Sequence, residues 1–240
     1  ALYKPGIHEH TMALATNLVN TAPCCGENFM INQKVVLVTG ASSGIGQATA
    51  RLLTEQGFWV FGTSRNPACV HGEPFTVLPL DVRSEQSVKQ CVDMVLAQTG
   101  RIDVLMNNAG YFGPVGAIEE VDLDDVQDVF QTNFFGMVRM VNAVLPTMRQ
   151  QKGGQIINMG SIAGIASPPF YAYYTATKRA IEGYTESLRY EVKHFNVRVS
   201  CVEPGYFSTN LYNTKVPAIR TISDYVLQRQ HAADAMDLYI

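Results

Sequence analysis

Short apolar runs alternate with longer amphipathic segments from Lys34 to the end of the chain. Six of these runs are almost continuously hydrophobic, as is typical of strands whose two faces are both covered. They lie at residues 34–39, 59–64, 75–80, 102–108, 154–161 and 196–204. Most of the intervening segments show helical periodicity. The alternation predicts βαβ units and an α/β fold with a doubly wound parallel sheet.

Local signals mark where the helices begin. Ser84 precedes a predicted helix at 85–97, and Asp122 is placed to cap the next helix, with an acidic residue three positions on. The segment 125–149 carries an apolar face and is predicted to end near Pro146 or just past it. Cys91 falls on an apolar helical stripe and is predicted to be a core residue.

Composition narrows the classes of partner. A chain of 240 residues is long enough for one domain with a large core, and its net charge of −3 leaves no basic surplus for nucleic acid. No apolar run reaches the ~18 residues of a membrane span. The five cysteines show no metal-ligand spacing, which favours reduced thiols, a cytoplasmic protein and no metal site.

The first 30 residues differ from the rest. They show little periodicity and no charged segment leading into a long apolar core, so a secretory signal is not expected. His8, His10, Cys24 and Cys25 match no common metal-site spacing. We interpret residues 1–30 as an N-terminal extension and 31–240 as the domain.

A glycine-rich turn follows the first predicted strand. The stretch "TGASSGIG" spans residues 39–46 and leads directly into a helix. In that context Gly40 permits a sharp turn, Gly44 lets the backbone approach a diphosphate, and Gly46 lets the helix pack against the strand. A dinucleotide site is favoured over a glycine turn without a ligand.

The end of the second strand indicates which dinucleotide. Ser64 stands where an acid would accept a ribose 2′-hydroxyl, and Arg65 follows it. A cation without a neighbouring carboxylate suits a 2′-phosphate, and Ser43 can add a hydroxyl. NADP(H) is therefore favoured over NAD(H). The alternative is that Arg65 merely closes a turn before Pro67.

Three tyrosines lie close together, and spacing distinguishes them. Of Tyr171, Tyr173 and Tyr174, only Tyr174 has a lysine four residues later, at Lys178. On a helix these two side chains share a face. Taken alone, such a pair is most often a surface contact.

Together the motifs resemble the short-chain dehydrogenase/reductase family, in its compact single-domain branch, over residues 31–212. The motifs are "TGASSGIG" (39–46), "LDV" (80–82), "NNAG" (107–110), Asn133, Ser161 in "GSIAG", "YTATK" (174–178) and "EPG" (203–205). Within that family, the sequence around these motifs most resembles that of the hydroxysteroid and retinol dehydrogenases. The resemblance implies a Rossmann-type fold with strand order 3-2-1-4-5-6. It also implies a seventh strand, for which the residues after Thr209 offer no convincing β run.

The resemblance assigns catalytic roles. Tyr174 matches the catalytic tyrosine, Lys178 its partner, Ser161 the serine that hydrogen-bonds the substrate oxygen, and Asn133 the asparagine that supports a water relay to the lysine. The chemistry asks for such a set independently. A carbonyl that accepts a hydride develops an alkoxide, which needs a proton donor and a second hydrogen-bond donor. Ser161 alone could cap a turn, and Asn133 alone could be a mid-helix amide.

The same resemblance implies the cofactor contacts. Asp81 would lie beside the adenine, although it could equally cap a loop. The expected cofactor-binding residues are Gly40, Ser42, Ser43, Gly44, Ile45, Gly46, Ser64, Arg65, Asp81, Val82, Asn108, Ala109, Gly110, Tyr174, Lys178, Pro204, Gly205 and Thr209.

The C-terminal segment, about 206–240, is expected to contribute to the substrate loop, and its last part reads as helix. Because the seventh strand is not evident, the chain is interpreted either as a fragment or as lacking its lid and last strand. An apolar pocket wall is predicted from Tyr111, Phe112, Ile162, Ile165, Phe170, Tyr206 and Phe207.

These observations predict an NADP(H)-dependent oxidoreductase that interconverts an alcohol and its carbonyl. The substrate is a small molecule, expected to be bulky and hydrophobic, such as a steroid or retinoid. The alternatives are a non-catalytic NADP(H)-binding sensor or scaffold, and a ketoreductase acting on acyl thioesters. Apolar positions on helices 125–149 and 173–193 predict a homodimer or homotetramer.

Overall fold

The computed structural model describes residues 33–237, and the side chains of residues 33–234. Its centre is a parallel six-stranded sheet in the order β3-β2-β1-β4-β6-β7, which confirms the predicted strand order. The label β5 belongs to a strand outside this sheet. The six strands are β1 (Val35–Val38), β2 (Trp59–Ser64), β3 (Thr76–Pro79), β4 (Val104–Asn107), β6 (Gly154–Met159) and β7 (Val197–Val202).

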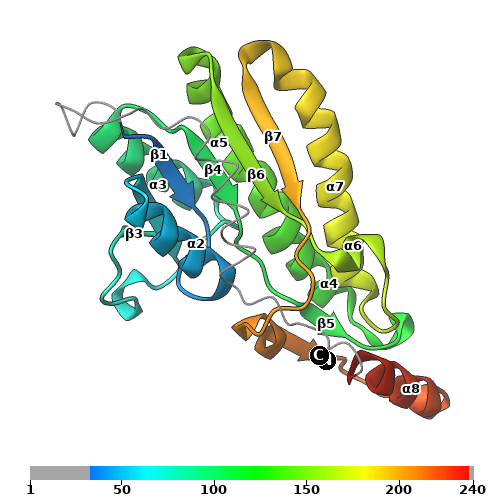
Figure 1. Cartoon of the computed structure of the whole chain (residues 1–240). Coiled ribbons are helices and arrows are strands. Elements are labelled where there is room, and N and C mark those ends of the chain that lie inside the picture. Colours follow the sequence, from blue (N-terminus) through cyan, green and yellow to red (C-terminus); the bar gives the residue numbers. More distant parts are fainter. Residues whose placement is uncertain (1–32, 238–240) are drawn as a thin grey trace, which may run out of the picture.

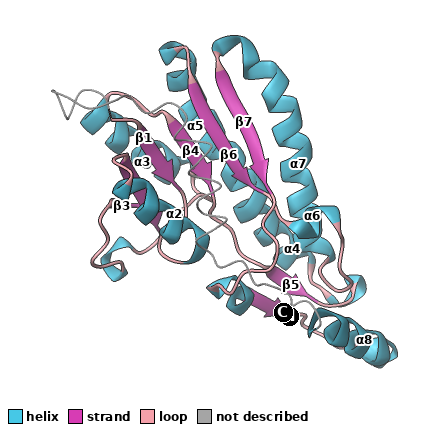
Figure 2. Ribbon diagram, viewed as in Figure 1, coloured by secondary structure: helices cyan, strands magenta, loops and turns pink. Residues whose placement is uncertain are grey.

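Helices cover the sheet on both faces (Figure 2). They are α2 (Gly44–Glu55), α3 (Glu85–Thr99), α4 (Leu123–Phe130), α5 (Gly136–Gln151), α6 (Ile162–Ile165), α7 (Ala172–Val192) and α8 (Val226–Asp237). One face packs against α3, α5 and α7, and the other packs against α2. All strands run in the same direction, so their carboxyl ends meet at one edge, towards β5 and α8 (Figure 1).

The central strand β1 shows why the strands read as continuous apolar runs. Val35 and Leu37 belong to the core with α3, α5 and α7, whereas Val36 and Val38 belong to the core with α2. All four are at most 1% exposed. Because side chains alternate across a strand, a sheet covered on both faces requires an apolar residue at every position.

The predicted caps are present. The Ser84 side chain accepts a hydrogen bond from the Ser87 backbone N–H at 3.2 Å. Asp122 likewise accepts from the Asp124 backbone N–H at 3.0 Å. Each therefore satisfies an amide of the first turn that has no partner within the helix.

The segment 125–149 is helical, and its end past Pro146 agrees with the prediction, but it is not one continuous helix. A π-helical turn, η3 (Gln131–Phe135), separates α4 from α5, and α5 continues past Pro146 to Gln151. The proline is tolerated because it and Asn142, whose carbonyl loses its partner, are both exposed to water. The π turn also shifts the helical register. The core face of α5 accordingly consists of Met137, Met140, Val141, Val144 and Met148.

A second, two-stranded sheet was not predicted. Its strands β5 (Gly113–Val115) and β8 (Lys215–Pro217) pair in parallel. Each has only three residues and the partners are about one hundred residues apart, so no local pattern marks them. The helical prediction near the C-terminus agrees with α8. Within residues 33–237 the main sheet has no seventh strand.

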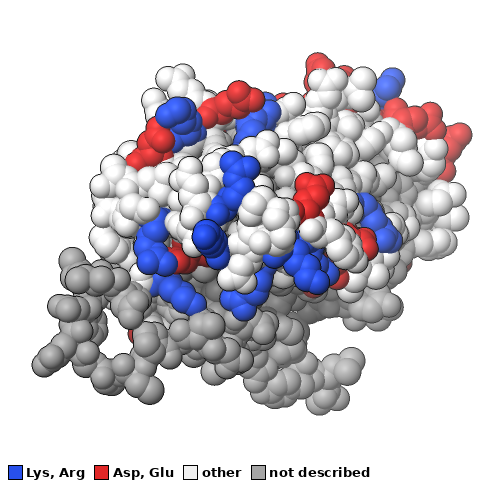
Figure 3. All heavy atoms as spheres, turned by 90° about the horizontal axis from the view of Figure 1, so that it is seen from above, with Lys and Arg blue, Asp and Glu red and all other residues white. Residues whose placement is uncertain are grey.

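Several other expectations concern the surface and the cysteines. None of the helices in the described part of the chain combines the length and apolar character needed to cross a bilayer. Over the same residues, no cluster of His, Cys, Asp and Glu could hold a metal ion, while His8, His10, Cys24 and Cys25 lie outside them together with the predicted extension. Cys91 is fully buried, and burial raises the pKa of its thiol to about 12. Basic side chains lie next to acidic ones on the face shown in Figure 3.

Candidate active site

The glycine turn between β1 and α2 is a left-handed, tightly braced segment. Gly40 has φ +66° and Gly44 has φ +60°, a region that favours glycine. A Cβ on Gly40 would lie 2.9 Å from the Ala109 Cα. The N-cap residue Ser43 makes no side-chain cap hydrogen bond, and the first turn of α2 holds no acidic residue. The N-terminal amides of α2 therefore remain available to an anion.

The residues after β4 brace this turn. The Asn108 side-chain amide donates to the backbone oxygens of Thr39 and Gly40, at 3.0 and 2.9 Å. The Thr39 hydroxyl accepts from the backbone N–H groups of Asn108 and Ala109. A Cβ on Gly46 would lie 2.3 Å from the Asn108 Nδ2 and 2.5 Å from the Gly40 oxygen. Gly46 thus makes room for this brace rather than for the strand.

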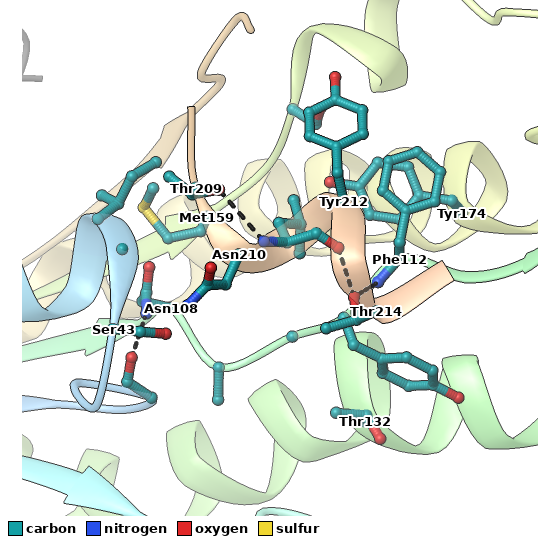
Figure 4. A pocket seen from close by; sticks show the side chains of 18 of the residues that line it. Ser43, Asn108, Phe112, Thr132, Met159, Tyr174, Thr209, Asn210, Tyr212 and Thr214 are labelled. Carbon is teal, nitrogen blue, oxygen red and sulfur yellow. Dashed lines mark hydrogen bonds between the residues drawn. The ribbon is translucent and has the colours of Figure 1, made fainter. Parts of the chain in front are cut away.

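A cavity of about 980 Å³ runs along the carboxyl ends of the strands. In Figure 4, Ser43 and Asn108 lie at one end and Tyr174, Phe112 and Tyr212 at the other. Of the residues expected to bind the cofactor, only Gly46 does not line it. The lining ones are Gly40, Ser42, Ser43, Gly44, Ile45, Ser64, Arg65, Asp81, Val82, Asn108, Ala109, Gly110, Tyr174, Lys178, Pro204, Gly205 and Thr209.

The end of β2 presents a cation to this cavity. Arg65 is exposed and, within residues 33–237, no hydrogen bond or ion pair engages its guanidinium. The turn before Pro67 is closed instead by Ser64, whose Oγ accepts from the Asn66 backbone N–H at 3.1 Å. Asp81 lines the cavity and also caps its loop, because its Oδ1 accepts from the Arg83 N–H at 2.9 Å.

Ser161, Tyr174 and Lys178 meet at the other end of the cavity. Ser161 follows β6 and caps α6, and its Oγ accepts from the Ala163 N–H at 3.2 Å. Its hydroxyl faces that of Tyr174, in the first turn of α7, and lowers the pKa of that phenol. Lys178 donates to the Met159 carbonyl at 2.7 Å, with its Nζ 5.5 Å from the Tyr174 ring centroid. The four-residue spacing places tyrosine and lysine on one helical face.

Burial shifts both titrating groups. Tyr174 is 5% exposed, and its pKa is raised because burial disfavours the phenolate, partly offset by the Ser161 hydrogen bond. Burial also lowers the pKa of Lys178 to about 8. At neutral pH the pair is therefore a neutral phenol, able to donate a proton, beside an ammonium whose charge favours the phenolate.

The hydroxyls of the other two tyrosines have other partners, although Tyr171 also lines the cavity. The Tyr173 hydroxyl donates to the Ile118 backbone oxygen at 3.0 Å. The Tyr171 hydroxyl is within hydrogen-bonding distance of the Lys215 Nζ, at 3.4 Å. Tyr174 is the tyrosine that contacts Ser161.

Asn133 lies in the π turn, behind the cavity rather than in its wall. Its amide accepts from the Tyr111 N–H and donates to the Tyr111 oxygen, both at 2.9 Å. It also donates to the Thr177 hydroxyl at 3.3 Å. These bonds fix the loop after β4, and the expected water relay to the lysine stays a prediction.

An aromatic cluster covers Tyr174 on the substrate side. Phe112 stacks on the Tyr174 ring, with centroids 4.5 Å apart and an interplanar angle of 6°, and also contacts Tyr171 and Tyr212. The Lys215 Nζ lies 4.7 Å from the Tyr212 ring centroid. Tyr212 and Lys215 were missed by sequence reasoning, because only the pairing of β8 with β5 brings their segment here.

The predicted apolar wall is only partly present. Tyr111, Phe112, Ile162, Tyr206 and Phe207 line the cavity. Phe170 lines a neighbouring groove, and Ile165 is 53% exposed outside both. Ile165 is the last residue of α6, and Phe170 lies in the loop between α6 and α7.

The cavity suits a nicotinamide dinucleotide. Gly44 leaves space that a side chain would fill towards Thr209, whose Cβ would be 3.5 Å from an added Cβ. The amides of α2 suit a diphosphate, and Arg65 suits a further phosphate. Ser161 and Tyr174, at the end of the cavity away from the glycine turn, suit a reacting carbonyl because their hydroxyl groups can donate hydrogen bonds to its oxygen.

Comparison with known families agrees with this geometry. The family model described as short chain dehydrogenase matches residues 34–219. The 3-ketodihydrosphingosine reductase of Bacteroides thetaiotaomicron is 43% identical over 202 residues, which are 84% of this chain and 72% of that protein. Retinol dehydrogenase 8 of Bos taurus is 41% identical over 185 residues, covering 72% of this chain and 58% of that protein.

Solved structures are similar as well. A short-chain dehydrogenase from Streptomyces avermitilis has a TM-score of 0.76 at 35% identity, covering 86% of this chain and 84% of that one. NAD⁺-bound xylitol dehydrogenase has a TM-score of 0.68 at 36% identity, with coverages of 73% and 71%. ElxO with NADP bound has a TM-score of 0.70 at 29% identity, with coverages of 76% and 77%.

Proposed function

Because the chain belongs to the short-chain dehydrogenase/reductase family of oxidoreductases, we propose that it interconverts an alcohol and its carbonyl with NADP(H). The observation that carries the proposal is the meeting of Ser161, Tyr174 and Lys178 at one end of the cavity whose other end is the glycine turn. When bound, the nicotinamide would give or take the hydride.

Ser161 and Tyr174 would hold the substrate oxygen. The Ser161 Oγ already accepts from the Ala163 N–H, and its own O–H, which lies beside the Tyr174 hydroxyl, would turn towards a ligand oxygen. During reduction this bond would stabilise the developing alkoxide, and Tyr174 would donate its proton to that oxygen. During oxidation the same phenol would have to act as a base.

Lys178 and Asn133 would support this chemistry from behind. One N–H of Lys178 is used by the Met159 carbonyl, which leaves two donors for the cavity. Its charge would lower the phenol pKa when Tyr174 acts as a base. Asn133 would position the loop of Tyr111, and with it Phe112 over the Tyr174 ring.

NADP(H) is preferred over NAD(H) in this proposal. Similar structures carry either cofactor, so the preference depends on this chain's own residues. The exposed Arg65 has no partner within residues 33–237, and Ser64 presents no carboxylate that would repel a 2′-phosphate. A charge-assisted contact of about 1.5–3 kcal/mol corresponds to roughly ten- to a hundredfold in affinity.

A hydrophobic substrate is proposed because aromatic and aliphatic side chains surround the reacting end. Phe112, Tyr212, Leu211 and Ile162 line it. Two relatives are named for 3-ketodihydrosphingosine and for retinol, both largely apolar molecules with an oxygen function. We propose the same general class for this chain.

Titration with NADPH and NADH, followed by a panel of ketones and alcohols, tests the proposal. NADPH should bind roughly ten- to a hundredfold more tightly. The double variant Ser64→Asp/Arg65→Ala should reverse the order, because aspartate accepts the 2′-hydroxyl and repels the phosphate. Arg149→Ala, at the carboxyl end of α5 near the opposite edge of the sheet, is the control and should leave both affinities unchanged.

Equal affinities for the two cofactors in the wild-type chain would refute the role of Arg65. Tight NADPH binding without turnover of any ketone or alcohol would instead favour the non-catalytic sensor. Turnover confined to acyl thioesters would favour the ketoreductase alternative.

A further inference from the structure

A second hollow, which we call the α8 groove, lies beside the active-site cavity. Its volume is about 1040 Å³. One wall is α8, and the others are the loop 166–170 after α6 and the short segment 116–118 after β5. Figure 1 shows α8 beside β5, at the edge towards which the strands point.

The groove is apolar and elongated. Its lining residues in the described part of the chain include no Asp, Glu, Lys or Arg. Ala117, Pro169 and Phe170 line it together with Ala232 of the helix. The helical contribution runs from Tyr225 to Ala232, two turns or about 10 Å. Apart from His231, Gln228, Ser167 and two tyrosines, the lining is apolar, so it suits an apolar occupant that extends along the helix.

Hydrogen bonds rather than apolar packing hold α8 in place. The buried Glu120 carboxylate accepts from the Ile222 and Ala117 backbone N–H groups, at 2.7 and 2.8 Å. It also pairs with Arg229 of α8, whose guanidinium lies 5.2 Å from the Phe170 ring centroid. The Arg229–Glu120 ion pair therefore attaches the helix to the segment after β5.

The groove is continuous with the active site. Ile162, Pro168 and Tyr206 line both the groove and the active-site cavity. Ile162 is the residue directly after Ser161. A molecule whose oxygen is held by Ser161 and Tyr174 can thus extend into the groove past these three shared residues.

We propose that the α8 groove binds the unbranched aliphatic tail of the carbonyl substrate. This inference rests on the proposed function, since Ser161 and Tyr174 must hold the oxygen end. It narrows the substrate class from bulky hydrophobic molecules to compounds with a polar carbonyl head and a long alkyl chain. The groove then selects for chain length, because each buried methylene adds apolar contact.

A series of unbranched methyl ketones, from butan-2-one to dodecan-2-one, tests the proposal with NADPH. kcat/KM should rise about two- to fourfold per added methylene until the groove is filled. Ala232→Trp, which fills the groove from α8, should lower kcat/KM for dodecan-2-one at least tenfold and leave butan-2-one within twofold. Ala233→Trp is the matched control: it is exposed on the same helix outside the groove and should change neither.

A kcat/KM that does not depend on chain length would overturn the inference while leaving the oxidoreductase function intact. So would an equal loss for both ketones in the Ala232 variant, or a change in its oligomeric state by light scattering, which would assign the groove to a second copy. If no ketone is reduced, binding of dodecan-2-one measured by calorimetry tests the role of the groove independently of catalysis. Binding that Ala232→Trp weakens and Ala233→Trp does not supports the groove, and absence of binding refutes it.

Discussion

Replacing Lys178 with methionine should make the protein more stable at neutral pH, even though it removes a proposed catalytic residue. The ammonium is 8% exposed, and burial lowers its pKa from 10.5 to about 8. That change corresponds to about 3 kcal/mol of cost for keeping the charged form in the folded state. Methionine has a similar length and carries no charge.

One loss opposes this gain. The Met159 carbonyl accepts from the Lys178 Nζ at 2.7 Å, and methionine cannot donate to it. Leaving a buried carbonyl without a partner costs about 1–2 kcal/mol. The net expectation for Lys178→Met at pH 7 is a gain of about 1–2 kcal/mol in the free energy of unfolding, or a few degrees in Tm.

The pH dependence separates the two effects. Below pH 8 the lysine is protonated in both folded and unfolded chains, so the full cost of burying the charge applies. Between about pH 8 and 10.5 the unfolded chain binds more protons than the folded one, so the stability of the wild-type chain rises relative to the variant. Near pH 10.5 only the lost hydrogen bond remains. The variant should then be the less stable protein.

Urea denaturation of both proteins at pH 7, 8.5 and 10 measures this difference. Groups that do not interact with Lys178 titrate equally in the two chains, so their contributions cancel. Lys193→Met, at an exposed position after α7, is the control and should show no such change with pH. A variant less stable than the wild type at pH 7, or a difference that stays constant with pH, would refute the reasoning.

Four further predictions follow from the same geometry. Tyr174→Phe should fold, because it removes one hydroxyl and keeps the stacked ring, but its turnover should fall by roughly 10²–10⁴-fold. Tyr173→Phe should keep the rate of the chemical step. A similar loss in both variants would mean that Tyr174 is not the proton donor. Gly46→Ala should weaken NADPH binding and lower the urea midpoint, since its Cβ would lie 2.3 Å from a side-chain nitrogen; an unchanged titration contradicts this. The pKa of Glu120 is lowered to about 2, chiefly by its hydrogen bond from Arg229 of α8. The Glu120 carboxylate therefore contributes stability above its ordinary pKa of 4.5, and this contribution is lost as the pH falls towards 2. Glu120→Gln should make the thermal stability depend less on pH between about pH 6 and 3, and an unaltered pH dependence would count against this reasoning. Finally, we expect a dimer that forms through α4, α5 and α7, with a contribution from Phe135, which is 43% exposed. Light scattering should show that Phe135→Glu shifts the dimer to monomer. A wild-type monomer at micromolar concentration would contradict this expectation.

Local patterns determined much of this protein. The alternation of apolar runs with amphipathic segments was enough to predict a doubly wound parallel sheet, because a sheet buried on both faces needs apolar residues at consecutive positions. The order of its strands came from the family resemblance. The position of Gly40 in the turn follows likewise, since only glycine adopts its positive φ without strain. The four-residue spacing of Tyr174 and Lys178 determined that both share a helical face.

Tertiary structure decided what no local pattern encodes. The π turn that carries Asn133 and the continuation of α5 through Pro146 depend on packing and on access of water, and propensity alone predicts neither. The pairing of β5 with β8 joins segments about one hundred residues apart, and it brings Tyr212 and Lys215 over Phe112. The pKa shifts of Tyr174 and Lys178 have the same origin. They arise from burial, which is a property of the folded environment and not of the residues themselves.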